Sequence, residues 1–536
     1  MSHVEDVKQP VEAGSEPVSA QKAVVQEAQA AAEVEHELGL LKSIKQYPKA
    51  ICWSVLLSTA IIMEGYDLLL MGSFYAQPPF QKRYGKQLED GTYQIPAPWQ
   101  SGLSNGASAG SIIGLMFNGY LSERFGFKRT MLGALALITA LIFIPFFAPS
   151  LEVLVVGQVL MGIPWGIFQT LTTAYAAEVT PTHLRAYLTT YVNLCWVFGQ
   201  LLASGILRAM LTRDDQWAYR IPFALQWIWP IPLIVGISFA PDSPWWLVRR
   251  NRISDARAAL ARLTSNNGAV DLDKAITLMV YTTEHEKELG TGTSYLSLFK
   301  GIDRRRTIIA CGCWLIQTLS GSSFRTYSTY FYKQAGLPTD QAFNMAIGQY
   351  ALGIVGVICA WFLLPRFGRR TFYVVGLVCM TSLLFIIGIL GAVSNPPTTS
   401  IAWTVGSLLL VYTFFYDISV GPVCYSLVSE IPSVRLRSKS IVLARASYNC
   451  LNIVTGVITP YMLNPGAWNW GAKTGFFYGG TCLLSLAFTF FCIPEPKGRT
   501  FAELDILFQK KTPARNFATT PVNLYEAAVV EKYERE

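Results

Sequence analysis

The sequence has 536 residues, of which 51% are hydrophobic and 15% are charged, and its formal net charge is +8. Soluble proteins carry about 25% charged residues, so this composition excludes an ordinary soluble globular protein and favours a polytopic helical membrane protein. The basic residues lie in short connections between apolar blocks instead of on one face, so the positive charge does not indicate a nucleic-acid-binding protein.

Metal and redox chemistry find little support in the cysteines and histidines. The ten cysteines lie almost all inside apolar blocks, where reduced thiols pack as small hydrophobic side chains. Cys311 and Cys313 are too close together for a usual zinc site, and the four histidines are not spaced as metal ligands. No nucleophile–base constellation is visible either, so we expect no metal, no cofactor and no enzyme.

Residues 1–46 are rich in Ala, Glu, Gln and Val and poor in aromatic residues. This composition predicts a cytosolic tail that is disordered or loosely helical. Because the chain opens with this polar tail and not with a cleavable signal peptide, we expect the first span to act as the insertion signal.

Apolar blocks of spanning length follow the tail in two groups of six, separated by a polar stretch. A span needs about 20 apolar residues. The blocks lie at 51–75, 100–121, 130–147, 152–176, 187–209 and 221–240, then at 307–333, 343–364, 371–393, 400–427, 438–463 and 472–493. The sequence therefore predicts an all-α membrane protein with 12 transmembrane helices.

The block pattern divides the chain into five regions. We predict a cytosolic tail over 1–46, an N-terminal six-helix bundle over 47–240, a cytosolic linker with short helices over 241–306, a C-terminal six-helix bundle over 307–493 and a cytosolic tail over 494–536. The basic residues gather on alternate connections, which by the positive-inside rule places both tails and the linker in the cytosol. The 77–99 loop, with Lys82, Arg83 and Lys86, is a weak exception.

Two carboxylates interrupt the first apolar block. Glu64 and Asp67 are three residues apart, so they share one face of a helix. A charge at the centre of a span costs about 2.5–3.5 kcal/mol on insertion scales, so this face is expected to look into a bundle interior or a wet cavity. A pathway for protons, ions or polar solutes is the first interpretation, and a polar lock between helices is the alternative.

The two halves repeat one another in matched order. The motif at 123–129 after the second block corresponds to 365–370 after the eighth, and the pair Glu178 and Arg185 corresponds to Glu430 and Arg437. Paired halves are typical of secondary transporters, and such charges at helix ends can pair in one state and separate in another. We interpret these residues as gating groups, with ordinary solvated charge as the alternative: Glu123, Arg124, Arg129, Glu178, Arg185, Arg366, Glu430 and Arg437.

The chain resembles a sugar porter of the major facilitator superfamily, and within it the fungal maltose and α-glucoside proton symporters. The sugar-porter motifs lie at 65–67, 124–129, 241–247 and 494–498. The motifs similar to those of α-glucoside permeases lie at 63–67, 157–166, 188–196, 225–230, 327–332, 428–432 and 468–473. The resemblance runs from about residue 45 to 515 and implies two six-helix bundles that close alternately over a central site.

The resemblance also implies roles for individual residues. Glu64 and Asp67 match acidic positions that the family uses for proton coupling, and Arg445 matches its intramembrane arginine. A buried arginine needs a counter-charge, and either carboxylate is an available partner. The predicted sugar-binding residues are Asn193, Gln200, Gln317, Ser322, Ser323, Gln349, Tyr425 and Asn449, although hydrogen bonding between helices is the alternative for each one singly.

Two residues depart from the family pattern. Pro365 stands where the loop of the second half usually has an acid, and Arg325 lies in the seventh block where α-glucoside permeases are typically apolar. Arg325 either reshapes specificity, slows the transport cycle, or snorkels at the outer interface.

We therefore expect a plasma-membrane importer that couples protons to the uptake of disaccharides such as maltose, with sugar, protons and the lipid bilayer as its partners and no nucleic acid. A sugar sensor of the same fold and a transporter of β-linked disaccharides such as cellobiose or lactose are alternatives. A drug or organic-ion antiporter is disfavoured by the Gln, Asn and Ser residues of the predicted site.

Overall fold

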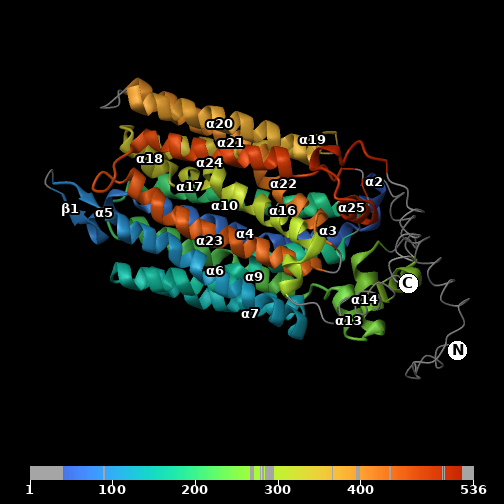
Figure 1. Ribbon diagram of the computed structural model, residues 1–536. Helices are drawn as coiled ribbons and strands as arrows, with labels where there is room; N and C mark the ends of the chain where they lie inside the picture. Colours follow the sequence, from blue (N-terminus) through green and yellow to red (C-terminus); the bar gives the residue numbers. More distant parts are fainter. Residues whose placement is uncertain are drawn as a thin grey trace, which may run out of the picture.

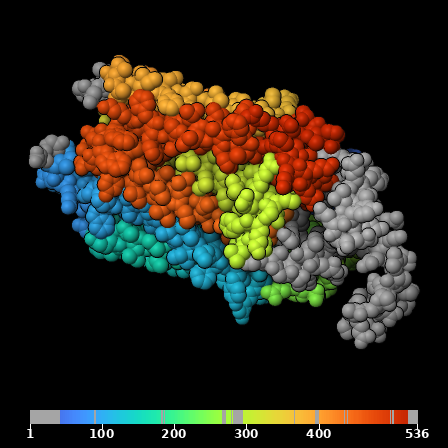
Figure 2. Space-filling view, in the orientation of Figure 1, coloured from blue at the N-terminus to red at the C-terminus, as the bar shows by residue number. Residues whose placement is uncertain are grey.

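The computed structural model describes residues 40–88, 91–180, 182–265, 271–277, 279–280, 283, 295–364, 366–393, 399–433, 436–497, 499 and 501–521. Its long helices lie roughly side by side, with the first half of the chain on one side and the second half on the other (Figure 1). The two halves meet along a seam that Figure 2 shows between the blue and the orange surfaces.

The first half contains twelve helical segments and a short hairpin in its described residues. They are α2 (Leu40–Gln46), α3 (Pro48–Ser58), α4 (Ala60–Phe74), α5 (Pro78–Tyr84), β1 (Lys86–Gln87), β2 (Tyr93–Gln94), α6 (Ala97–Phe125), α7 (Phe127–Leu141), α8 (Phe143–Phe147), α9 (Leu151–Val179), α10 (Thr182–Met210), α11 (Trp217–Leu225), η1 (Gln226–Ile228) and α12 (Pro230–Ser238). The two strands pair antiparallel, with Lys86 opposite Gln94.

The linker and the second half follow. In the linker the described helices are α13 (Pro244–Arg249), α14 (Ile253–Leu263) and η2 (Tyr295–Phe299). The second half has α16 (Gly301–Gln317), η3 (Thr318–Ser322), α17 (Ser323–Thr326), α18 (Ser328–Gln334), α19 (Thr339–Leu363), α20 (Arg369–Val393), α21 (Thr399–Ile418), α22 (Val420–Glu430), α23 (Arg437–Leu463), η5 (Gly471–Lys473), α24 (Thr474–Cys492), α25 (Phe501–Gln509) and η6 (Ala514–Asn516).

The two ends of the bundle differ. Figure 1 shows α5, β1 and α18 at one end, which we call the hairpin end after residues 78–94. At the other end it shows α13, α14 and α25, and we call this the linker end after residues 241–306. Helix α6 runs from the hairpin end to the linker end. The position of a residue along a long helix therefore shows how far it lies from each end of the bundle.

The fold is that of a multi-pass membrane protein. Eleven helical stretches in the described residues are long and apolar enough to cross a membrane. Helix α6, which has 29 residues, is not among these eleven and lies where the second span is predicted. With it the described part of the structure has twelve long helical stretches in the predicted order. Large apolar side chains on the outside of the bundle are exposed, such as Met116 at 74%, Phe362 at 73% and Leu484 at 71%. Only a hydrocarbon environment makes such an outer surface favourable.

The predicted seventh block is not one continuous helix. A π-turn at η3 contains Gly321 at φ +107°, and a second break at Tyr327 separates α17 from α18. The carbonyl groups that the break frees are satisfied, because Tyr412 donates to the oxygen of Ser320 at 2.7 Å and Thr481 donates to that of Leu319 at 2.6 Å. A broken helix is tolerated at membrane depth only when its backbone groups are paired in this way.

Helices α6 and α9 approach closely because small residues face one another. A Cβ atom added to Gly110 would lie 2.0 Å from the carbonyl oxygen of Val159. Small residues permit this kind of backbone contact between membrane helices. The close packing fixes the face of α6 that carries polar residues toward the second half.

The linker helices are attached to the first half. Trp246 of α13 donates through Nε1 to the carbonyl oxygen of Glu123 at 2.9 Å, and Arg249 donates to Glu178 at 2.7 Å. Arg262 of α14 donates to the carbonyl oxygen of Phe239. One of the short helices predicted in the linker is present as α14, which buries Ala256, Ala259, Leu260 and Leu263.

Candidate functional site

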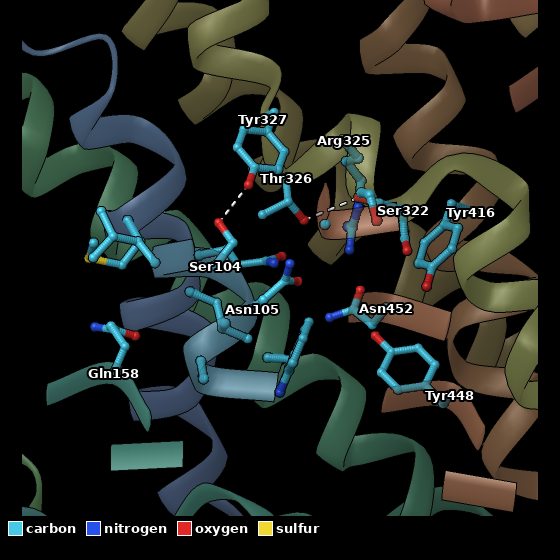
Figure 3. A pocket seen from close by; sticks show the side chains of 18 residues that line it. Ser104, Asn105, Gln158, Ser322, Arg325, Thr326, Tyr327, Tyr416, Tyr448 and Asn452 are labelled. Carbon is cyan, nitrogen blue, oxygen red and sulfur yellow. Dashed lines mark hydrogen bonds between the residues drawn. The ribbon is translucent and has the colours of Figure 1, made fainter. Parts of the chain in front are cut away.

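A cavity with a volume of about 60 Å³ lies between the halves. The first half contributes residues of α4, α6, α9 and α10, and the second half contributes residues of η3, α17, α21 and α23. Figure 3 shows polar side chains of both halves pointing into it, among them Ser104, Asn105, Gln158, Ser322, Arg325, Tyr448 and Asn452.

Some amide atoms that line this cavity have no partner among the described residues. Gln200 is 0% exposed and neither atom of its side-chain amide forms a hydrogen bond there, whereas the equally buried Gln158 lies against the carboxylate of Asp67. The Oδ1 atom of Asn105 is likewise unpartnered. Buried polar atoms normally find a partner, so amides left open toward a cavity indicate that a polar ligand satisfies them.

The buried carboxylate of Asp67 is held by amides and not by a cation. Asp67 is 0% exposed, and Gln226 of η1 donates to its Oδ1 atom at 2.5 Å. Its Oδ2 atom lacks a hydrogen-bond partner, and Gln158 also lies against the carboxylate. One of the two glutamine side chains around Asp67 therefore also lines the cavity.

An amide connects Glu64 to Arg445 across the interface between the halves. Gln169 of α9 donates to Glu64, and Arg445 of α23 donates through Nε to the Oε1 atom of Gln169 at 2.9 Å. Arg445 also stacks on Trp314 and Tyr448, with ring centroids 4.3 and 4.5 Å from its guanidinium carbon. The direct ion pair that the sequence favours between Arg445 and an acid of the first block is replaced by this bridge.

Both acids of the first block are one side chain away from the cavity. Gln158 contacts Asp67, Trp196 contacts Glu64, and both Gln158 and Trp196 line the cavity. A change of charge at either acid therefore reaches the cavity wall through a single neighbour.

A buried ion pair lies in the second half. Arg325 Nη1 contacts Asp417 Oδ2 at 3.0 Å, and the two residues are 3% and 0% exposed. The interpretation of Arg325 as a snorkelling residue at the outer interface is wrong, because its guanidinium points into the bundle and lines the cavity (Figure 3). Sequence reasoning missed Asp417, although the rule that identified Glu64 and Asp67 applies equally to a carboxylate inside the block at 400–427.

The predicted sugar-binding residues divide into two groups. Gln200, Ser322 and Ser323 line the cavity, whereas the other five do not. Gln317 donates to the carbonyl oxygen of Gly421 at 2.8 Å, and Gln349 accepts from the hydroxyl of Tyr332 at 2.6 Å.

The remaining three predicted residues do not line the cavity either. Tyr425 packs edge-on against Trp314 with centroids 4.9 Å apart, Asn193 lies against the carboxylate of Asp417, and Asn449 is buried. The cavity instead includes Ser104, Asn105, Gln158, Asn452 and the aromatic residues Tyr327, Tyr416 and Tyr448, which sequence reasoning did not select. Gln158 and Asn452 are polar residues inside predicted helices and could have been selected for that reason. Whether such a side chain faces a cavity depends, however, on how the helices pack.

Two of the three predicted gating carboxylates form ion pairs, Glu178 with the linker and Glu430 within the second half. Glu178 accepts from Arg249 at 2.7 Å, and Glu430 accepts from Arg369 at 3.0 Å. Asp242 accepts from the backbone N–H of Lys128, and Glu495 accepts from those of Arg369 and Arg370, so the predicted repeat is also present in the contacts.

The other predicted gating residues are distributed along the same end. Glu123, Arg124, Arg129 and Arg366 are exposed there, and Arg437 begins α23. Arg185 lies in α10, but its side chain and Pro365 are outside the described residues.

Hydrogen bonds between the halves are concentrated near the hairpin end in the described part of the chain. Lys333 donates to the carbonyl oxygen of Ala76 at 3.0 Å, and Gln94 donates to the hydroxyl of Tyr330 at 2.7 Å. Further contacts there join Ser104 to Tyr327, Ser73 to Thr329, Asn464 to Ile95 and Arg208 to Asn344. Toward the linker end, the Arg445–Gln169 bond and one from Trp361 to Thr190 at 2.9 Å cross the interface.

Comparison with known proteins agrees with this architecture. The chain is 45% identical over 495 residues to a general α-glucoside permease of Saccharomyces cerevisiae, covering 91% of this chain and 80% of the relative. It is 46% identical over 515 residues to maltose permease MAL31 of the same organism, covering 94% and 83%.

Among solved structures, the proton:xylose symporter XylE bound to 6-bromo-6-deoxy-D-glucose shares the fold. The TM-score is 0.72, at 22% identity, over 86% of this chain and 100% of the other. The family model described as "Sugar (and other) transporter" matches residues 53–508. The chain therefore belongs to the sugar transporter family, has the fold of that symporter, and is a membrane transporter and not an enzyme.

Proposed function

We propose that this chain is a proton-coupled importer of α-linked disaccharides such as maltose, working by alternating access. The observation that carries the proposal is the position of two buried carboxylates, each one side chain away from a cavity lined by unpartnered amides. Carboxylates exchange protons, and amides and hydroxyls both donate to and accept from sugar hydroxyls.

The chemistry of the cavity wall favours a neutral polyhydroxyl ligand. Gln158, Gln200 and Asn105 offer donors and acceptors together, and Trp196, Tyr416 and Tyr448 offer rings to the apolar faces of a sugar. The α-glucoside class is supported by the names of the yeast relatives. Competition by the β-linked disaccharides cellobiose and lactose tests whether the recognised glycosidic bond is α-linked.

Proton coupling follows from the amide bridge in this proposal. When Glu64 takes a proton, the charge that orients Gln169 disappears, and the bond from Arg445 to Gln169 loses its fixed acceptor. Because Arg445 belongs to the second half and Gln169 to the first, loosening this bond favours separation of the halves at the linker end. Asp67 acts on the cavity from the first half alone, through Gln158.

Orientation and location complete the proposal. Basic residues such as Arg129, Arg250 and Arg370 gather at the linker end, which by the positive-inside rule supports a cytosolic location for that end, the linker and both tails. The membrane of this proposal is the plasma membrane. The hydrogen bonds at the hairpin end then close the outer side, with the lipid bilayer around the exposed apolar belt. Glu123, Arg124, Arg129, Glu178, Arg185, Arg366, Glu430 and Arg437 serve as gating groups on the inner side.

Uptake into proteoliposomes tests the proposal. Purified protein should accumulate labelled maltose when an inward proton gradient is imposed, and an uncoupler should abolish accumulation. Competition by maltose, trehalose, cellobiose, lactose and glucose should rank the α-linked disaccharides first. Binding without accumulation would indicate a sensor, and stronger competition by cellobiose or lactose would overturn the α-linkage.

A further inference from the structure

Arg325 occupies an unusual place in the cavity wall. It belongs to α17, a four-residue helix between the π-turn at η3 and the break at Tyr327. Both breaks turn this short segment away from the direction of a regular helix, and Figure 3 shows Arg325 and Thr326 on the cavity side.

The position of the guanidinium is fixed from several directions. Asp417 accepts from Nη1 at 3.0 Å, and the ring of Tyr416 lies 4.6 Å from the guanidinium carbon. The backbone oxygen of Arg325 accepts from Tyr350 at 3.3 Å and from Gln349 at 3.4 Å. The side chain is thereby held in one orientation before any ligand arrives, which reduces the entropy that binding costs.

Part of the guanidinium remains unused by the protein. Among the described residues, Asp417 is the one hydrogen-bond acceptor of this group, and Nε is buried without a partner. A guanidinium is a planar fork of donors and has no acceptor. Two neighbouring oxygen atoms of a ligand match the spacing of such a fork.

Asp417 also determines which charge of ligand this group suits. It balances the positive charge of Arg325 at close range, so an anionic ligand would bring its carboxylate or phosphate next to Asp417. The nearby cavity residues Ser322, Thr326, Tyr416 and Asn452 are uncharged. The chemistry therefore favours adjacent hydroxyl groups of a neutral sugar over an acidic sugar.

We propose that Arg325, held by Asp417, is a specificity-determining residue that donates hydrogen bonds to two adjacent hydroxyl groups of a neutral sugar ring. This inference rests on the proposed function and deepens it, because it assigns donor recognition of a diol to a residue of the second half. The competing explanation is that the pair only fastens α17 to α21.

Deoxy analogues of the ligand distinguish the two explanations. The binding of maltose and of analogues that each lack one hydroxyl would be measured on the purified full-length protein. In the wild type, analogues that lack either of two adjacent hydroxyls should bind about tenfold more weakly than maltose. In the double variant Arg325→Leu/Asp417→Leu these two analogues should bind as well as maltose does, because their donor is gone.

The double variant replaces the pair by apolar side chains of moderate size, which buried sites often tolerate. If the double variant does not fold, Arg325→Lys can be used instead, because it keeps the charge but not the planar fork. This variant should bind the two deoxy analogues about as tightly as it binds maltose. Arg257→Lys, at an exposed pair in the linker, is the matched control and should keep the wild-type profile.

Each result has one meaning. An unchanged deoxy profile in either folded Arg325 variant overturns the inference and leaves a fastening role. Galacturonic-acid disaccharides that outcompete maltose in the wild type would overturn the assignment to neutral sugars. Failure of the wild type to bind any disaccharide would instead defeat the proposed function.

Discussion

The buried carboxylates of the two halves are held in opposite ways. In the first half, Asp67 and Glu64 accept hydrogen bonds from the amides of Gln226 and Gln169. In the second half, Asp417 faces the guanidinium of Arg325 at 3.0 Å. An amide donates a hydrogen bond to a carboxylate without supplying a positive charge, whereas a guanidinium supplies both the hydrogen bond and the charge.

This difference separates acids that can carry protons from an acid that stays ionised. Protonating Asp417 would leave the charge of Arg325 buried and unbalanced, and losing one partner of a buried pair costs about 3–5 kcal/mol. Protonating Asp67 leaves no adjacent cation without its partner, and Glu64 is separated from Arg445 by the amide of Gln169, which can reorient when Glu64 takes a proton. The comparison predicts that the acids of the first half carry out proton coupling, whereas Asp417 of the second half has a structural role.

The largest effect is expected from Asp67→Asn. The variant keeps the shape of the side chain but cannot exchange a proton, so the accumulation ratio of maltose under a proton gradient should fall to about 1, the value for uncoupled equilibration. Uptake into proteoliposomes measures this ratio.

Sugar binding by Asp67→Asn should persist, since Gln158 and Gln200 are unchanged. Asp273→Asn, an exposed aspartate of the linker, serves as the control. Wild-type accumulation by Asp67→Asn would remove Asp67 from the coupling machinery.

Asp417→Asn should mainly affect stability. It leaves Arg325 without its counter-charge and should lower the free energy of unfolding by about 3–5 kcal/mol. Thermal unfolding in detergent measures the loss, and Arg325→Leu/Asp417→Leu should recover most of it. If Asp417→Asn unfolds like the wild type and instead loses accumulation, the second half also takes part in coupling.

Gln169→Leu should weaken the bond between the halves near the linker end. A hydrogen bond to a charged group contributes about 1.5–3 kcal/mol, so the equilibrium should move about tenfold or more toward the state open at that end. The alkylation rate of a cysteine introduced at Asn452, which lines the cavity, reports this change.

Thr173→Val lies one turn further along α9 and removes a hydroxyl that bonds only within its own helix, so it is the matched control. Equal alkylation rates in the Gln169→Leu variant and the wild type would show that the amide bridge does not hold the halves together.

The smallest of these effects is expected from Gln158→Leu. Loss of one uncharged hydrogen-bonding group costs about 0.5–1.5 kcal/mol, so maltose should bind up to about tenfold more weakly. Titration of the purified protein measures the affinity, with Thr172→Val on the same helix as the control. Unchanged affinity would place the sugar away from this side of the cavity.

The fold could be predicted from sequence almost completely, because apolar blocks of spanning length leave few alternatives. The boundaries of α20, Arg369–Val393, lie within two residues of the predicted 371–393. The breaks at Gly321 and Tyr327 were not predicted, since the kink of the seventh block depends on partners such as Tyr412 and Thr481 from other helices.

The candidate site could be predicted only in part. Charges inside apolar blocks are conspicuous, which is why Glu64 and Asp67 were found and why Asp417 could have been found, whereas Arg445 was selected through the family resemblance. Uncharged polar residues are not conspicuous in this way, because the same glutamine can face a cavity, as Gln200 does, or bond a backbone carbonyl group, as Gln317 does. Which of these applies is decided by helix rotation, and a single sequence does not contain it.

The attachment of the linker has a practical consequence for watching the molecule work. Trp246, Arg249 and Arg262 tie α13 and α14 to the first half, so these helices travel with it as one rigid body. A dye on the exposed face of α14 and a second dye on α25 would therefore act as a ruler between the halves, and its reading during turnover would follow the rocking motion directly.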